Sequence, residues 1–277
     1  PPRPLIRAAK ALLHDLKERA DVRRADLVVV SYPKSGRTWL RLLVGRALAE
    51  QFGVLEATEA DPDLLLRTER LAALAPGIPS VVFSHDDKPH TRPTPEIETD
   101  KSRFADSRVL FLHRDPRDVA VSQYLSLTRR TENGYMGSLA AFVRDEALGP
   151  ANHIAYLNVW ARAMVALPSV RFLSYEALHA APEAELASVL AFAGAEGVVR
   201  EVIERAVAFG SFENMRRMET GGTFRSGMLR PADPSDPASF KTRSGTVGGY
   251  TEHLAAADIA HLDALLADRL DPVYGYG

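Results

Sequence analysis

The segment Tyr32–Trp39, Tyr-Pro-Lys-Ser-Gly-Arg-Thr-Trp, carries the residue types of an anion site. It follows a short apolar run and precedes a helical pattern, so we interpret it as a strand-to-helix turn. The first amides of a helix lack internal partners and lie at the positive end of its dipole, which favours a bound anion. Within Leu27–Ala49 there are four basic residues and no acidic one. We expect a phosphate or sulfate here, bound by Lys34 and a hydroxyl of Ser35 or Thr38.

This turn differs from the loop of magnesium-dependent nucleotide hydrolases and kinases. In the G-x-x-x-x-G-K-[ST] loop the lysine follows the second glycine, and a hydroxyl holds magnesium. Here Lys34 precedes Gly36, the only glycine of the turn, and no aspartate ends a second strand in an obvious metal-holding place. The sequence therefore disfavours a magnesium-dependent NTPase and predicts no metal site.

A second cationic segment, Phe111–Tyr124, begins at the end of another apolar run. Arg114 leaves the predicted strand, Pro116 is suited to the first position of a helix, and Ser122 follows two turns after Arg114. The His-Arg-Asp triplet in this segment invites comparison with protein kinases. Ala120 occupies the place of the kinase asparagine, and the kinase Gly-rich loop and D-F-G are absent, so that reading fails.

The elements that must position these segments alternate between strands and helices. Short, β-branched apolar runs predict strands at residues 26–31, 80–84, 108–113 and 170–174. Helical spacing predicts helices at residues 39–49, 119–127, 137–146, 155–166, 182–193 and 198–208. Such alternation is typical of an α/β fold. We expect one three-layer domain over residues 25–277, with a mostly parallel sheet flanked by helices as in P-loop NTPases.

Residues 220–249 form a polar stretch rich in glycine and proline without periodicity. A loop of this length in a compact domain is usually functional or disordered. Because it carries Arg225, Arg230, Lys241 and Arg243, we predict a mobile lid over an anion; disorder is the alternative.

Composition bounds the remaining possibilities for the 277 residues. A net charge of −2 argues against general nucleic-acid binding, and the absence of cysteine excludes disulfides and Cys-ligated metals. We expect a cytoplasmic protein without a transmembrane segment. Residues 1–24 carry seven basic and three acidic side chains and predict an amphipathic helix. It would pack on the domain, with weak contact to a membrane surface as the alternative.

The two cationic segments together resemble those of sulfotransferases that use 3′-phosphoadenosine 5′-phosphosulfate (PAPS). That family has a Y-P-K-S-G-[TS]-T-W segment for the 5′-phosphosulfate and an R-[ND]-P-R-D-V-A-V-S segment for the 3′-phosphate. Lys34 and Arg114 stand 80 residues apart in the matching segments. Phe172–Leu178 resembles the strand ending in Y-E-[DA]-L, and Ser211–Met215 resembles S-F-x-x-M. Arg243–Gly248 resembles the terminal R-K-G-x-x-G, the weakest of the matches.

The resemblance implies sulfuryl transfer from PAPS to an acceptor hydroxyl, with 3′-phosphoadenosine 5′-phosphate (PAP) as product. Lys34 would stabilise the leaving phosphate, and Ser122 would bind the 3′-phosphate and tether Lys34. His85 follows the second predicted strand, where the family has K-T-H-L-P, and would be the general base. Imidazole suits this because its ordinary pKa lies near neutral pH. Asp86 and Asp87 are rival bases.

The resemblance also implies a set of donor-binding residues. Those around the 5′-phosphate and adenine are Lys34, Ser35, Gly36, Arg37, Thr38, Trp39, Tyr175 and Phe212. Those around the 3′-phosphate are Arg114, Ser122, Arg243, Ser244 and Gly245. Five positions depart from the family: Phe83 and Ser244 replace lysines, Arg37 replaces a small hydroxyl residue, and Gly249 and Tyr250 replace Asp-Trp. Any sulfonate contact made by the first lysine must therefore come from elsewhere.

The sequence indicates less about the acceptor than about the donor. The Asp86–Asp87 pair and the polar residues 128–135 favour a carbohydrate, a glycolipid or a hydroxylated natural product. We expect a small-molecule or glycan partner and a monomer or homodimer. The alternatives are a P-loop nucleotide kinase or phosphotransferase and a non-catalytic nucleotide-binding regulator.

Overall fold

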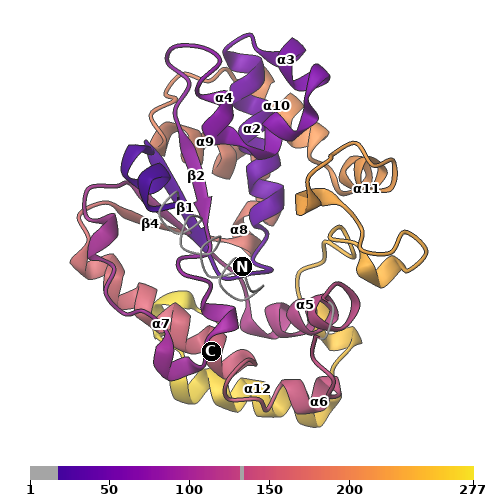
Figure 1. Ribbon diagram of the computed structural model, residues 1–277. Coiled ribbons are helices and arrows are strands. Elements are labelled where there is room, and N and C mark those ends of the chain that lie inside the picture. Colours follow the sequence, from indigo (N-terminus) through magenta and orange to yellow (C-terminus); the bar gives the residue numbers. More distant parts are fainter. Residues whose placement is uncertain (1–17, 132–133) are drawn as a thin grey trace, which may run out of the picture.

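A four-stranded sheet forms the centre of the computed structural model, which describes residues 18–131 and 134–277 (Figure 1). The strands are β1 (Leu27–Ser31), β2 (Val81–Ser84), β3 (Val109–His113) and β4 (Val170–Ser174). They lie in the order β2-β1-β3-β4, and every neighbouring pair is parallel. All four predicted strands are confirmed to within one residue at each end.

The helices of the described residues follow the strands and fill the connections between them. They are α2 (Arg37–Gln51), α3 (Leu55–Ala60), α4 (Thr68–Leu71), α5 (Pro116–Arg129), α6 (Leu139–Phe142), α7 (Pro150–Ala166), α8 (Tyr175–Ala180), α9 (Pro182–Phe192), α10 (Arg200–Phe209), α11 (Phe212–Thr220) and α12 (Ala256–Arg269). Residues 18–24 are helical, and Val22 is buried against the domain. The rest of the predicted N-terminal helix lies outside the described residues. In the part described, no helix is long and apolar enough to span a membrane.

The alternation of side chains along β1 divides the core into two layers. Leu27 and Val29 pack with apolar residues of α2, α9 and α10, whereas Val28 and Val30 pack with α7 on the opposite face. All four side chains are fully buried, because both faces of a parallel sheet are covered by helices. In Figure 1 these helices lie on the two sides of the strands. The expected three-layer α/β architecture is therefore confirmed.

The carboxyl ends of the four parallel strands meet at one edge of the sheet. β1 runs into the turn that contains Lys34, and β2 is followed directly by His85. β3 is followed directly by Arg114, and β4 by Tyr175. Ligands of open α/β sheets bind outside this edge, where strand order reverses around the first strand. Four predicted site residues are thus delivered to one place by topology alone.

The helix predicted at residues 137–146 is wrong in extent. Only Leu139–Phe142 is α-helical, with Ser138 as its N-cap. The carboxylate of Asp145 accepts the amides of Ala147 and Leu148, both at 2.9 Å, which favours a turn over helix continuation. Two other predicted helices begin earlier than expected, at Pro116 and Pro150, where proline fits the first helical turn.

The 220–249 segment is irregular, as expected, but it carries its own small core. Short 3₁₀ turns occur at Gly227–Leu229 and Pro237–Ser239. Phe224, Leu229 and Phe240 are buried. The segment is therefore packed on the domain in this state, and its mobility stays a prediction.

Gly45 tests the packing of α2 on the turn at residues 62–66. A Cβ at this position would lie 2.1 Å from the backbone oxygen of Leu65, which cannot move without moving its turn. Alanine favours helices over glycine by about 1 kcal/mol, but overpacking costs about 1–3 kcal/mol and more against rigid backbone. We expect Gly45→Ala to lower the free energy of unfolding by about 1–2 kcal/mol in urea denaturation. Gly227→Ala, where no atom lies within 4 Å, is the control; equal stability of both variants would refute the packing argument.

Candidate active site

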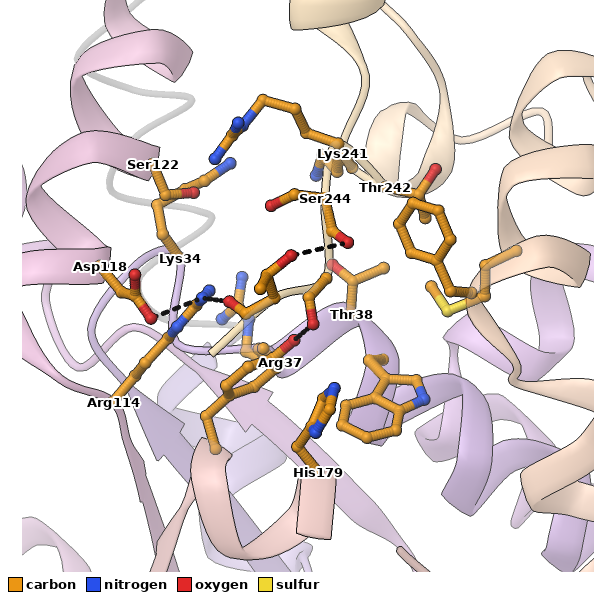
Figure 2. A pocket seen from close by; sticks show the side chains of 18 of the residues that line it. Lys34, Arg37, Thr38, Arg114, Asp118, Ser122, His179, Lys241, Thr242 and Ser244 are labelled. Atoms are coloured by element: carbon orange, nitrogen blue, oxygen red, sulfur yellow. Dashed lines mark hydrogen bonds and ion pairs between the residues drawn. The ribbon is translucent and has the colours of Figure 1, made fainter. Parts of the chain in front are cut away.

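A cavity of about 700 Å³ lies at the carboxyl edge of the sheet (Figure 2). It brings together thirteen of the fourteen residues predicted from the sequence: Lys34, Gly36, Arg37, Thr38, Trp39, His85, Arg114, Ser122, Tyr175, Phe212, Arg243, Ser244 and Gly245. Ser35 does not line it. This serine is fully buried in the turn, and its hydroxyl has no hydrogen-bond partner in the described structure.

The turn after β1 adopts a backbone conformation that few sequences tolerate. Lys34 has a φ of 74° and Gly36 a φ of 91°, both in the left-handed region. At Gly36 a Cβ would lie 2.5 Å from the ring of Tyr175, so only glycine fits. A positive φ at a lysine costs free energy and is typical of functional turns. The turn thus presents Lys34 and the first amides of α2 to the cavity.

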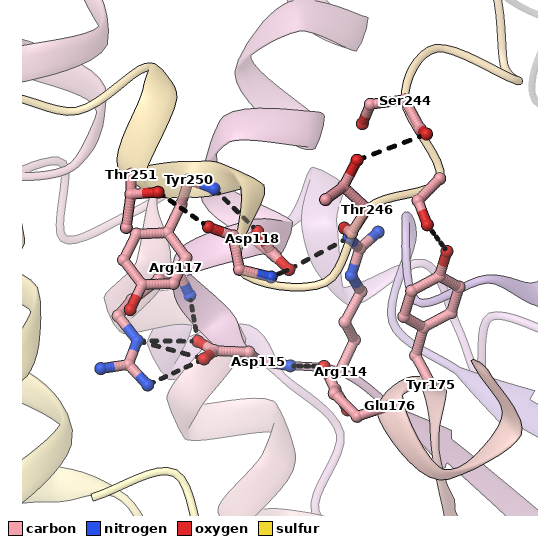
Figure 3. Close-up of polar contacts among 12 residues, drawn as sticks. Arg114, Asp115, Arg117, Asp118, Tyr175, Glu176, Ser244, Thr246, Tyr250 and Thr251 are labelled. Atoms are coloured by element: carbon pink, nitrogen blue, oxygen red, sulfur yellow. Dashed lines mark hydrogen bonds and ion pairs between the residues drawn. The ribbon is translucent and has the colours of Figure 1, made fainter. Parts of the chain in front are cut away.

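Arg114 is held by a carboxylate and by the 220–249 segment (Figure 3). Its Nη2 donates to Asp118 Oδ2 at 3.1 Å and to the backbone oxygen of Thr246 at 2.8 Å. Asp118 also accepts the amides of Gly248 at 2.9 Å and Tyr250 at 3.0 Å. One buried carboxylate therefore fixes both the arginine and the backbone that passes over it.

Tyr175 joins the turn, the arginine and the 220–249 segment. Its ring lies against Gly36, and the guanidinium carbon of Arg114 is 4.1 Å from the ring centre. Its hydroxyl donates to the backbone oxygen of Gly245 at 3.1 Å. Gly245 in turn leaves no room for a side chain, because a Cβ would lie 2.9 Å from the ring of Phe212. These contacts set the walls of a flat aromatic pocket.

The other predicted residues are oriented as follows. Trp39 Nε1 donates to the backbone oxygen of Gly210 at 2.9 Å, which fixes the indole edge at the cavity wall. Arg243 Nη1 lies 3.0 Å from His253 Nε2. Ser122 faces the same cavity as Lys34, yet no hydrogen bond joins them in the described part of the chain.

His85 has one ring nitrogen committed and one available. Its Nδ1 lies 2.9 Å from the backbone oxygen of Ser31, and a carbonyl can only accept, so Nδ1 carries the proton. Nε2 is then the basic nitrogen. Burial, followed by the positive charge of Arg37, lowers the pKa of His85 well below 6.5. The imidazole is therefore neutral at physiological pH, the form that a general base requires.

The two aspartates after His85 point elsewhere. Asp86 is buried, accepts from Lys101 Nζ at 2.7 Å and from Trp160 Nε1 at 2.9 Å, and pairs with Arg103. Asp87 pairs with Arg92 at 2.9 Å. Neither residue lines the cavity. Their contacts are structural, which favours His85 over both rivals.

Four site residues were not predicted from the sequence. Asp118 lies inside the Arg-Asp-Pro-Arg-Asp segment, so its position in a motif could have signalled it. Lys241 and Arg130 line the cavity, and Arg130 donates to the backbone oxygens of Ser239 and Arg230. Glu219 is fully buried behind the wall, where it accepts the backbone amide of Lys241 at 2.8 Å. Lys241 was predicted only as one of the cations of the 220–249 segment, and no local pattern marks Arg130 or Glu219.

The cavity is strongly cationic. Its basic residues are Lys34, Arg37, Arg114, Arg130, Lys241 and Arg243, and Asp118 is the one acidic residue among the described residues that line it. Burial and neighbouring cations lower the pKa of Lys34 to about 8, of Lys241 to about 7 and of Arg37 to about 9. In residues 18–131 and 134–277, no cluster of three or more acidic or histidine residues could hold a metal ion. The site is built to bind a polyanion through side chains.

Residues 24–272 match the sulfotransferase domain family. This chain belongs to the sulfotransferase family. Among its curated relatives, cytosolic sulfotransferase 17 of Arabidopsis thaliana is 25% identical over 265 residues, covering 88% of this chain and 74% of the relative. The 3-alpha-hydroxysteroid sulfotransferase of Cavia porcellus is 22% identical, covering 96% and 91% of the two chains.

Solved structures of sulfotransferase-like proteins share the fold. Mouse sulfotransferase SULT7A1, complexed with PAP, superimposes with a TM-score of 0.59 at 18% identity and covers 91% of this chain and 89% of its own. Retinol dehydratase in a complex with retinol and PAP gives a TM-score of 0.60 at 19% identity, with coverage of 88% and 80%. The expected P-loop-like fold class is thereby confirmed for this sulfotransferase.

Asp118→Asn tests how this sulfotransferase holds the 220–249 segment. The amide keeps the shape of the side chain but loses the charge and one accepting oxygen. Hydrogen bonds to a charged group contribute about 1.5–3 kcal/mol, so we expect the amides of Gly248 and Tyr250 to exchange with deuterium about tenfold faster or more. Asp263→Asn, which removes an exposed partner of Arg117, is the control. Unchanged exchange in Asp118→Asn would show that other contacts hold the segment.

Proposed function

We propose that this sulfotransferase transfers a sulfuryl group from PAPS to an acceptor hydroxyl. The observation that carries the proposal is the pair of separated cationic positions, Lys34 on one side and Arg114 with Arg243 on the other, in one cavity. A donor with phosphate groups at two ends of an adenosine needs two such anchors. The mouse sulfotransferase and retinol dehydratase structures that share the fold are complexes with PAP, which supports this choice of donor.

The residues of the cavity fit the phosphates and base of such a donor. Lys34, Thr38 and the amides that open α2 would bind the 5′-phosphate, with Ser35 and Gly36 shaping the turn. Arg114, Ser122 and the 243–245 backbone and side chains would bind the 3′-phosphate. Trp39, Tyr175 and Phe212 would enclose the adenine between their rings.

The reaction is a direct displacement at sulfur. The acceptor oxygen forms a bond to sulfur while the bond from sulfur to the bridging phosphate oxygen breaks, and that oxygen leaves with the electron pair on PAP. The acceptor proton passes to Nε2 of His85, which is unprotonated beforehand. Lys34 stabilises the charge that develops on the departing phosphate. Ser122, which lines the same cavity, would tether Lys34 before the sulfuryl group is in place.

The lining beyond His85 and Lys34 supports a hydroxylated acceptor. Ser126, Thr131 and Arg130 supply hydrogen-bonding groups on that wall, next to the apolar Leu229. A mixed wall of this kind suits a carbohydrate, a glycolipid or a hydroxylated natural product. Membership in the family argues against the nucleotide-kinase alternative. The absence of cysteine and the cytosolic names of the plant relatives support a cytoplasmic location.

Arg114→Ala tests the proposed 3′-phosphate site. The variant should weaken binding of PAP by about 10²-fold, because a charge-assisted bidentate contact to phosphate is lost. Binding of 5′-AMP, which lacks the 3′-phosphate, should change by no more than about threefold. Calorimetric titration of both nucleotides measures this, with the exposed Arg200→Ala as control. Equal weakening of both nucleotides would remove the case for a 3′-phosphate site at Arg114.

His85→Ala tests the reaction itself. Wild-type protein should transfer label from radiolabelled PAPS to members of a pooled set of sugars, glycolipids and phenols. His85→Ala should lower turnover by about 10²–10⁴-fold and keep PAP binding, because only proton transfer is lost. His261→Ala on α12 is the control. Near-normal turnover in His85→Ala would refute the base, and PAP binding by wild type without any transfer would identify a nucleotide-binding regulator.

A further inference from the structure

The sulfuryl group has a defined place in this cavity if the proposed function holds, and the inference rests on that function. In a direct displacement, sulfur lies between the incoming oxygen beside His85 and the leaving oxygen beside Lys34. Negative charge is spread over the three sulfuryl oxygens that do not bridge to phosphate. Cations that face the space between His85 and Lys34 are therefore candidates to hold these oxygens.

Arg37, the first residue of α2, lines the same cavity as His85 and Lys34. Among the described residues its guanidinium has neither a hydrogen bond nor an ion pair, although it is only partly exposed. After burial, its positive charge is the strongest influence that lowers the pKa of both His85 and His90. Arg37 and His85 thus line one cavity, and the charge of Arg37 acts on the His85 ring. No cation comes from position 83, where the ring of Phe83 packs 4.6 Å from the guanidinium of Arg41.

Lys241 lines the same cavity from the 220–249 segment. Hydrogen bonds to Glu219 hold its backbone against α11. Glu219 accepts the amide of Lys241 at 2.8 Å, and the amide and hydroxyl of Thr242 at 2.9 and 2.6 Å. These three bonds occupy the carboxylate, and in the described structure the Lys241 ammonium has no ion pair. After burial, the charges of Lys34, Arg130 and Arg37 lower its pKa. The ammonium therefore lies in the field of both Lys34 and Arg37.

We propose that Arg37 and Lys241 hold the sulfuryl oxygens of the donor, one from each wall of the cavity (Figure 2). The side chain of Arg37 is thereby assigned to the sulfuryl group, while its backbone amide remains available to the 5′-phosphate. As the acceptor oxygen bonds to sulfur and the sulfur–oxygen bond to phosphate breaks, both cations stay in contact with the transferred oxygens. The planar group and its charge are oriented between His85 and Lys34.

The comparison of PAPS with PAP isolates these contacts, because PAP is the same nucleotide without the sulfuryl group. Affinities of the full chain for PAPS and for PAP are measured by calorimetry and by Trp39 fluorescence. Arg37→Gln and Lys241→Met should each weaken PAPS binding by about tenfold or more, the loss of one charge-assisted contact. PAP binding should change by about twofold or less. Arg37→Lys and Lys241→Arg should recover most of the preference for PAPS, and Arg200→Gln, an exposed cation away from the cavity, should match wild type.

Each remaining outcome decides against the inference. Equal weakening of PAPS and PAP would assign both side chains to the 5′-phosphate, and no weakening of either would exclude them from donor binding. PAP binding by a variant shows that it is folded. Lys241 is exposed to the cavity, so Lys241→Met leaves the core intact. That variant still tests the inference if Arg37→Gln does not fold. A wild-type protein that binds neither nucleotide refutes the proposed function instead.

Discussion

The cost of burying a cluster of cations, increased by their mutual repulsion, is the constraint to which this site is built. Six basic side chains face one cavity of about 700 Å³; five of them are half-buried and therefore less screened by water, and Lys241 is exposed to the cavity. The pKa values of Lys34 and Lys241 fall to about 8 and about 7 because protonation is costly there. A polyanion relieves that cost when it binds. The repulsion that lowers these pKa values is thus relieved when an anionic ligand binds.

Two buried carboxylates, Asp118 and Glu219, stabilise this cluster of cations without neutralising it. Asp118 accepts hydrogen bonds from the backbone amides of residues 248 and 250. Glu219 accepts them from the backbone amides of residues 241 and 242. A buried charge is tolerable only when its hydrogen-bonding capacity is satisfied, and these amides satisfy it. The same bonds tie an irregular segment to α5 and α11. The same two carboxylates therefore compensate positive charge and hold the 220–249 segment in place.

The sequence predicted the sheet and most of the site because both depend on local patterns. Short β-branched runs mark buried strands, and the motif around Lys34 and the motif around Arg114 each follow a strand directly. Lys241 and Glu219 were not assigned because their contact joins positions 22 residues apart through an aperiodic segment. The path of such a segment depends on tertiary packing, which no local spacing encodes. The helix at 139–142 is shorter than predicted because the side chain of Asp145 accepts the amide of Ala147 and stabilises a turn in place of further helix.

The order of the strands reproduces the order of the proposed chemistry. In the sheet order β2-β1-β3, the first strand ends at His85, the second at the Lys34 turn and the third at Arg114. The proposed base, leaving-group cation and distal phosphate anchor therefore follow one another along a single edge of the sheet. Tyr175, which follows β4, packs its ring against both Gly36 and the guanidinium of Arg114. The parallel sheet therefore fixes the relative positions at which these residues enter the cavity.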